Sequence, residues 1–262
     1  MTDFDNIIGE LSDTIDYVSE SFKEESLSYI NLFTDYLNEC YVEPPMDTIA
    51  NESNLVMSAK KFPVLVILTI GNSPLATVIR KTTGDTFSHS SISFKTSLNP
   101  MYSFGENHGI PGKTNISPLP SMGFVKTHPK DILWHSDIRK VPYSIYGTLV
   151  NYDTLNKMKN RLEFFLRNAF ELKYSFSQLV RVKLNITSHS EAKWFCSRFV
   201  AEILNAGKDL PKDPSLYRPQ SFTELVDMVF LHKGPDLSMY QKAPVEKALK
   251  SISPKADIGE AK

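Results

Sequence analysis

The chain has 262 residues, of which 41% are hydrophobic, and a formal net charge of −1. This length fits one large or two small domains with a sizeable core. The longest apolar stretch, residues 62–70, is much shorter than the roughly 20 residues of a membrane-spanning helix. Met1 is followed by acidic residues instead of a basic and apolar leader, and two cysteines allow one disulfide at most, so we expect a soluble protein of the reducing cytoplasm.

The net charge hides two parts of opposite sign. Residues 1–52 hold 13 acidic residues against Lys23 alone, a net charge of −12, so the other residues together carry +11. Three explanations stay open. Both parts are solvated surfaces, or the acidic part docks on the basic part, or the basic part binds an anionic polymer.

Apolar residues recur at spacings of three and four through the first 40 residues, which is typical of an amphipathic helix. We therefore expect one long or two consecutive helices over most of residues 2–42. The stripe fits a packed helical arm or a self-associating coil, although Glu25 and Glu39 interrupt the strict repeat of a coiled coil. Prolines at 44 and 45 then begin a linker, so we assign residues 1–55 to an acidic helical arm.

The pattern after the linker predicts a body of mixed strands and helices over residues 56–235. Continuous or alternating apolar runs are typical of strands, and periodic ones of helices. We expect strands at residues 62–70, 87–94, 101–104 and 141–150, and helices from a turn at Ser73 and Pro74 through Arg80, over 153–169, around Cys196 and over 222–230.

Less regular structure is expected elsewhere. Residues 105–141 are rich in Gly, Pro and His, so we predict a long functional loop there. The chain becomes polar after His232, and we predict a loosely ordered tail over residues 236–262. Within the helix at 153–169, the expected inward residues are Leu155, Met158, Leu162, Phe165 and Leu166.

Cys196 is the leading candidate for a reactive group. A lone cysteine in an apolar helix is by default a small buried hydrophobic residue. At a helix N-terminus, however, the partial positive charge lowers the pKa of a thiol and favours the nucleophilic thiolate. Ser188 to Glu191 match a capping box, which would put the cysteine two turns inside a helix; we favour a helix that begins near Lys193.

His89 lies on a predicted strand among serines and is the candidate base for the thiol. The alternative is a structural histidine. A histidine base needs a group that orients its second nitrogen, and Ser103 on the neighbouring strand is the favoured candidate. No other histidine has metal-ligand spacing to a cysteine or acid, so we expect no metal, no cofactor and no nucleic-acid partner.

Four segments resemble the permuted NlpC-type branch of the papain-fold superfamily, which contains cysteine peptidases, amidases and acyltransferases. They are FSHSSISF at 87–94, MYSFG at 101–105, GFV at 123–125 and FCSRFV at 195–200. The resemblance covers residues 60–230 and is strongest to a subset found in bacteria and their phages. It implies that His89 and Cys196 are catalytic. Relatives often carry an acid or amide where this chain has Arg198, and arginine where it has Glu106, so the substrate stays open.

The sequence therefore predicts an α+β fold, namely a circularly permuted papain-like fold in which an antiparallel sheet packs on the cysteine-bearing helix. The predicted activity is a cysteine hydrolase that cleaves a peptide or isopeptide bond, with peptidoglycan stem peptides as the substrate that the resemblance suggests. The alternatives are a virion or assembly protein that retains the fold, and an acyltransferase. A phage-encoded chain would be located in the virion, and the helical arm would mediate self-association or bind another protein.

Deletion of residues 1–52 should leave a folded body with an altered oligomeric state or altered substrate access, because an isolated amphipathic helix is stable only when its apolar stripe is covered. Light scattering and the labelling rate of Cys196 in the full and shortened chains measure the difference. Identical masses and labelling rates would show that the arm is a passive extension, and a shortened chain that fails to fold would show that the arm belongs to the core.

Overall fold

The computed structural model describes residues 60–71, 74–107, 121–130, 140–169, 171–253 and 258. The chain separates into two compact units, Met1–Asn54 and Leu55–Lys262. Several predictions lie outside the described residues and stay predictions. They concern the arm helices, Cys40, Ser73, His108 and His135.

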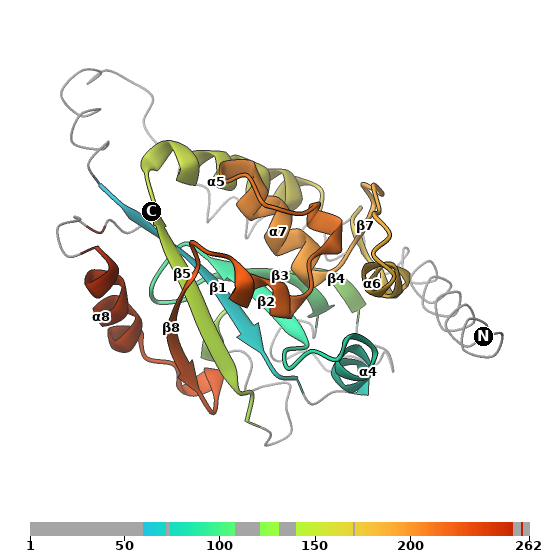
Figure 1. Ribbon diagram of the computed structural model, residues 1–262, viewed down its shortest axis with the longest axis horizontal. Coiled ribbons are helices and arrows are strands. Elements are labelled where there is room, and N and C mark those ends of the chain that lie inside the picture. The colour runs from blue at the N-terminus through green and yellow to red at the C-terminus, as the bar shows by residue number, and fades with distance from the viewer. Residues whose placement is uncertain are drawn as a thin grey trace, which may run out of the picture. The chain divides into compact units, whose positions relative to one another are not determined.

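A six-stranded antiparallel sheet forms the centre of the second unit, in the order β4-β3-β2-β1-β5-β8 (Figure 1). Its strands are β1 Phe62–Thr69, β2 His89–Ser93, β3 Met101–Asn107, β4 Ser121–Thr127, β5 Tyr143–Val150 and β8 Val229–Gly234. All eight residues of β1 are buried, because neighbouring strands cover its edges and hydrophobic clusters cover both its faces. The predicted α+β fold with an antiparallel sheet is confirmed.

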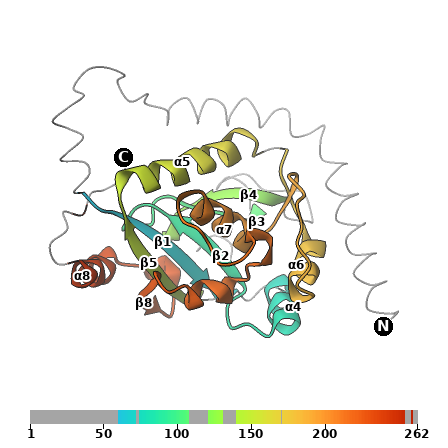
Figure 2. The ribbon, with the colours of Figure 1, turned by 45° about the horizontal axis from the view of Figure 1, so that its top comes forward.

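Helices and short ordered segments surround this sheet. The helices are α4 Pro74–Thr83, α5 Tyr152–Arg167, α6 Phe176–Lys183, α7 Cys196–Gly207 and α8 Lys242–Ile252, with 3-10 turns η2 Pro214–Leu216, η3 Pro219–Glu224 and η4 Leu237–Met239. α5 and α7 lie side by side over one face of the sheet (Figure 2). A two-stranded parallel ribbon, β6 Lys173–Tyr174 with β7 Lys193–Trp194, leads into α7.

Aromatic rings fill the space between α7 and the sheet. The Phe199 ring of α7 lies 5.5 Å from Phe104 and 5.6 Å from Phe124, which belong to β3 and β4. It also lies 4.9 Å from Phe165 of α5, whose ring is 4.6 Å from Trp194. Rings at these spacings stabilise a fold beyond the apolar area that they bury. This cluster fixes α5 and α7 on the sheet.

The helix predicted over 153–169 is α5. It begins directly after β5, at a polar capping residue. The Asn151 side chain accepts a hydrogen bond of 2.8 Å from the Thr154 N–H, which satisfies one of the free amides of the first turn. Four of the predicted inward residues are buried, and Leu166 is partly buried against the same cluster.

Two predictions of local structure are wrong. A strand, β4, occupies residues 121–127 of the predicted loop, because its backbone pairs with β3. The helix predicted over 222–230 is instead the turn η3 followed by β8. The open edge of β5 supplies a hydrogen-bonding partner there, so sheet pairing outweighs the helical periodicity.

The predicted loose tail is also wrong for residues 237–252, which form η4 and α8. Val245 and Leu249, one helical turn apart, are fully buried in a hydrophobic cluster that also contains Leu65 and Ile67 of β1. This second cluster covers the face of the sheet opposite α7.

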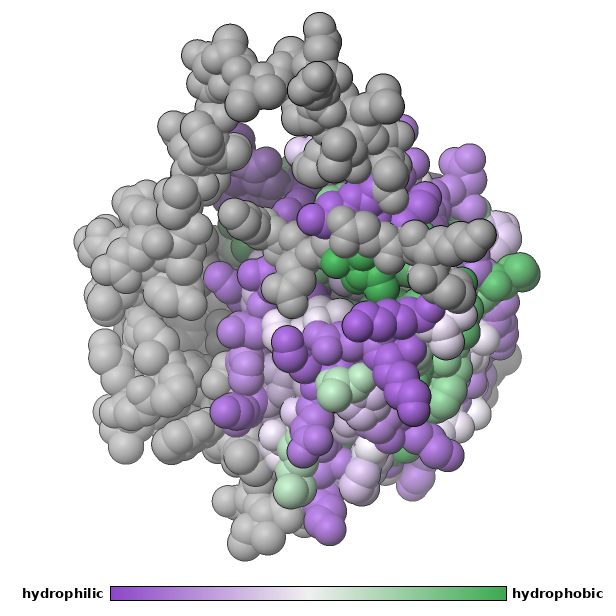
Figure 3. Space-filling model, turned by 90° about the vertical axis from the view of Figure 1, so that its left-hand side faces the viewer, coloured by the Kyte–Doolittle hydropathy of each residue, from purple (hydrophilic) through white to green (hydrophobic). Residues whose placement is uncertain are grey.

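The side of the molecule shown in Figure 3 is mainly hydrophilic where it is coloured. α8 contributes exposed lysines to the surface of the protein.

Two adjacent phenylalanines of α5 test the aromatic cluster. Phe165→Ala should lower the free energy of unfolding by about 3–5 kcal/mol, because it leaves a cavity among fully buried rings. Phe164→Ala is the matched control, because Phe164 is 38% exposed, and it should cost below about 1 kcal/mol. Urea unfolding measures both values, and equal losses would contradict this account of the core.

Candidate active site

Cys196 is the first residue of α7. The residue before it, Phe195, has extended backbone angles (φ −144°, ψ 164°) and no side-chain cap. The capping box therefore does not start the helix, in agreement with the favoured interpretation, and the cysteine is at the helix start. The helix begins three residues after the expected position near Lys193. Residues of that box bond elsewhere, since the Ser190 hydroxyl accepts from the Lys193 N–H at 3.3 Å and the Ser188 N–H donates to Ser215 Oγ at 3.0 Å.

Arg198 explains why the segment before Cys196 is not helical. Its Nη1 donates to the carbonyls of Ser190 at 2.8 Å and Lys193 at 2.9 Å, and to the Gln178 side chain at 3.2 Å. The guanidinium also lies 4.0 Å from the Trp194 ring, where cation and ring attract each other. Arg198 is buried and anchors the ribbon that leads into α7, so its position two residues after the cysteine has a structural explanation.

The Cys196 thiol faces Ser90 of β2. It is 1% exposed, and burial raises its pKa above the ordinary value of 9.0 because the thiolate is poorly solvated there. Four weaker influences lower the pKa, namely the main chain and hydroxyl of Ser90 and the main-chain groups of Ser197 and Cys196 itself. Burial outweighs the helix terminus, so the lowered thiol pKa expected from the sequence is wrong.

Ser90 was not among the site residues predicted from the sequence. Its side chain is fully buried beside the thiol, and its hydroxyl is one of the groups that favour the thiolate. The signal was the alternation of β2, because Ile92 is a core residue and a residue two positions away shares its face. The serine next to the histidine, and not the histidine, shares the face of the apolar residues that meet α7.

His89 is the first residue of β2 and its ring lies over β3. A side-chain carbon added at Gly105 would lie 3.2 Å from its Cε1, so the glycine leaves the room that the ring occupies. Its Nε2 lies 3.4 Å from the Ser91 hydroxyl. Because successive strand residues point to opposite faces, the backbone directs Ser90 to the face of α7 and His89, like Ser91, to the other. The thiol–imidazole pair stays a prediction, which requires the ring to reach the face of α7.

Ser103, the predicted orienter of His89, has another partner. Its hydroxyl is buried and donates to the Ser90 carbonyl at 2.6 Å. This bond holds β3 against β2 at the residue that faces the thiol. Ser103 therefore supports the site through the Ser90 backbone.

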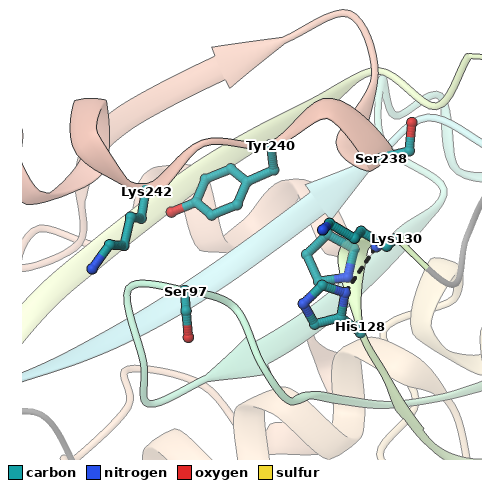
Figure 4. Close-up of a pocket in the computed structure, with 7 residues that line it drawn as sticks. Ser97, His128, Lys130, Ser238, Tyr240 and Lys242 are labelled. Carbon is teal, nitrogen blue, oxygen red and sulfur yellow. Dashed lines mark hydrogen bonds between the residues drawn. The ribbon is translucent and has the colours of Figure 1, made fainter.

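Another described histidine, His128, belongs to a different part of the structure. His128 follows β4, where its Nδ1 accepts from the Lys130 N–H at 3.0 Å, and it lines a cavity of about 160 Å³ (Figure 4). The other residues of that lining are Ser97, Pro129, Lys130, Ser238, Tyr240 and Lys242. Figure 4 shows that they come from three separate segments, and neither Cys196 nor His89 is among them.

The described part of the chain contains neither a metal-ion cluster nor a membrane-spanning helix. Among those residues, no three His, Cys, Asp or Glu side chains lie close enough together to hold a metal ion. No helix within the described ranges has the length and apolar character needed to cross a membrane.

The chain matches no protein-family model and no curated protein.

The raised pKa can be measured directly in the Cys40→Ser variant, where Cys196 is the sole remaining thiol. Its thiolate absorbance at 240 nm should appear above pH 9 and its alkylation by iodoacetamide should be slow at pH 7, because burial favours the neutral thiol. The folded state then holds this proton more tightly than the unfolded chain, so the free energy of unfolding should fall as pH rises through that range. A thiolate already present at pH 7 would contradict the burial of the Cys196 thiol.

Proposed function

We propose that this protein is a cysteine hydrolase that cleaves an amide bond through Cys196. The observation that carries the proposal is the convergence of the first residue of α7 with a buried strand serine, which surrounds one sulfur with main-chain groups and a hydroxyl. Free N–H groups at a helix N-terminus stabilise negative charge. They suit both a thiolate and the oxyanion that forms when sulfur attacks a carbonyl.

The reaction follows from these groups. A base removes the thiol proton, and the sulfur bonds to the substrate carbonyl carbon, whose oxygen becomes an oxyanion near the amides of Cys196 and Ser197. Collapse of this intermediate breaks the carbon–nitrogen bond, and the protonated base returns its proton to the leaving amine. Water then hydrolyses the thioester and restores the thiol. We assign the base to His89, in line with the resemblance of the two motifs.

In this proposal, the structure with its buried, neutral thiol corresponds to the resting state of the enzyme. Attack requires the site to open to substrate and the start of β2 to rearrange, so that the His89 ring reaches the face of α7. The resemblance points to peptide or isopeptide bonds, with peptidoglycan stem peptides as the candidate substrate, and to a virion location if a phage encodes the chain.

A second candidate is an assembly or virion protein that keeps the fold without catalysis. The burial of Cys196 and the placement of the His89 ring against Gly105 favour it. In this case the cysteine is a core residue of α7, and Ser90 fills the space beside it.

Hydrolysis assays distinguish the two candidates, with a chromogenic thioester or activated ester and with purified peptidoglycan as substrates. The hydrolase should form an acyl-enzyme on Cys196, seen by mass spectrometry as an adduct, and should lose at least about a hundredfold in rate in Cys196→Ala, in line with the loss of a nucleophile. His89→Ala should lose rate while keeping the fold. Lys247→Ala, an exposed change on α8, is the control. No adduct and equal rates in all variants would favour the assembly protein.

A further inference from the structure

A second cavity, of about 290 Å³, lies between the C-terminal end of α6 and the segment of η2 and η3. Its lining contains three cationic side chains, Lys183, Lys212 and Arg218. The rest of the lining is Val182, Asn185, Leu216 and Ser221. No carboxylate is among these described lining residues, but Asp85 lies 2.8 Å from Arg218 and offsets part of its charge, so the two lysines supply most of the positive charge of the cavity.

Arg218 is held rigidly at the wall. Its Nη1 donates to Asp85 Oδ1 at 2.8 Å and to the Thr83 carbonyl at 3.2 Å, which ties η3 to the segment after α4. Both bonds use Nη1, whereas a guanidinium carries five N–H donors over three nitrogens. The ion pair with Asp85 therefore positions the group and leaves donors to spare.

Neutral donors complete the lining. Ser221 Oγ accepts from the Arg218 N–H at 3.2 Å, so its own O–H can donate to a bound group. Asn185, with a positive φ of 56°, contributes a side-chain amide. The nearest acid in sequence, Asp213, accepts from the Ser215 amide and hydroxyl at 2.8 and 2.5 Å, which keeps it ionised and directed at Ser215.

The cavity wall is coupled to the start of α7. The Ser197 hydroxyl, one residue after the cysteine, donates to the Tyr217 carbonyl at 2.8 Å, and Tyr217 lies between Leu216 and Arg218 of the lining. A group bound here would be attached to the same rigid segment that supports Cys196.

We propose that this cavity binds an oxyanion group, a carboxylate or a phosphate, through Lys183, Lys212 and Arg218. Arg218 offers a guanidinium held by Asp85 and Thr83, and the exposed Lys183 and Lys212 add positive charge. Arginine and lysine donors together are the usual recognition chemistry for such groups. The proposal goes beyond the amide hydrolysis and does not depend on it, because the charges and the cavity are independent of the thiol.

Calorimetric titration of the full chain tests the site, with inorganic phosphate and acetate as probes at constant ionic strength. At least one anion should bind, and Lys212→Gln should raise its dissociation constant by roughly fivefold or more, the effect of one charge-assisted hydrogen bond. Lys247→Gln, a surface change on α8, should leave the constant unchanged. Binding by phosphate alone identifies a phosphoryl group, and binding by acetate alone identifies a carboxylate.

Lys183→Gln is the second variant and should weaken binding in the same way, while circular dichroism verifies that both variants fold. The proposal is overturned if neither anion binds the wild-type chain, or if Lys247→Gln weakens binding as much as Lys212→Gln, which would indicate a general charge effect. The same titration in Cys196→Ala should give the wild-type constant, so that failure of the hydrolase proposal and failure of the anion site are separate outcomes.

Discussion

The packing of Phe199 determines where the candidate site lies. Its ring is enclosed by rings from two strands of the sheet and from α5, and it is three residues after the cysteine on α7. A helix held this tightly cannot slide along the sheet without opening cavities that cost several kcal/mol. The first turn of α7 is therefore fixed against β2, and the Cys196 thiol meets Ser90. Arg198 reinforces this position by anchoring the ribbon that precedes the helix.

Two opposing effects decide the state of the thiol. The first turn of α7 offers main-chain groups that favour a thiolate, while burial disfavours any charge. Burial is the larger effect, so the resting thiol is neutral. A reactive cysteine is more often partly exposed in an electropositive setting, and an inert one buried. Cys196 lies at a helix N-terminus, as a reactive cysteine can, but it is buried like an inert one. For this reason the hydrolase and the assembly protein are both candidates.

Most of the fold could be predicted from the sequence, because long runs with clear periodicity determine it. The apolar run of β1 and the three-and-four spacing of α5 lie where the sequence placed them, within two residues at each end. The predictions failed where tertiary contacts outweigh local signals. The start of α7 is one case, since we expected it near Lys193, whereas Arg198 and the β6–β7 ribbon hold that segment extended. α8 is another, since two apolar residues in a polar stretch join the hydrophobic cluster on the second face of the sheet and order the helix.

The candidate site was predicted in part. Cys196 is at a helix start next to the histidine strand, as the two motifs suggested, yet the residue that faces it is Ser90 and not His89. The face of a strand residue depends on register, which changes with a shift of one position and is weakly marked in a run of small polar residues. The side chains that lie beside a neighbouring strand, such as His89 over Gly105, depend on pairings that only the folded sheet shows.

Cysteine cross-linking tests most directly which residue of β2 faces the thiol. In a chain that also carries Cys40→Ser, Ser90→Cys should form a disulfide with Cys196 under mild oxidation, because a disulfide requires two facing side chains a few ångströms apart. His89→Cys, one residue away and on the other face, should remain reduced. Mass spectrometry of the digested proteins distinguishes the results. Efficient cross-linking of His89→Cys with none for Ser90→Cys would contradict the placement of α7 on β2 and would put the histidine beside the cysteine instead.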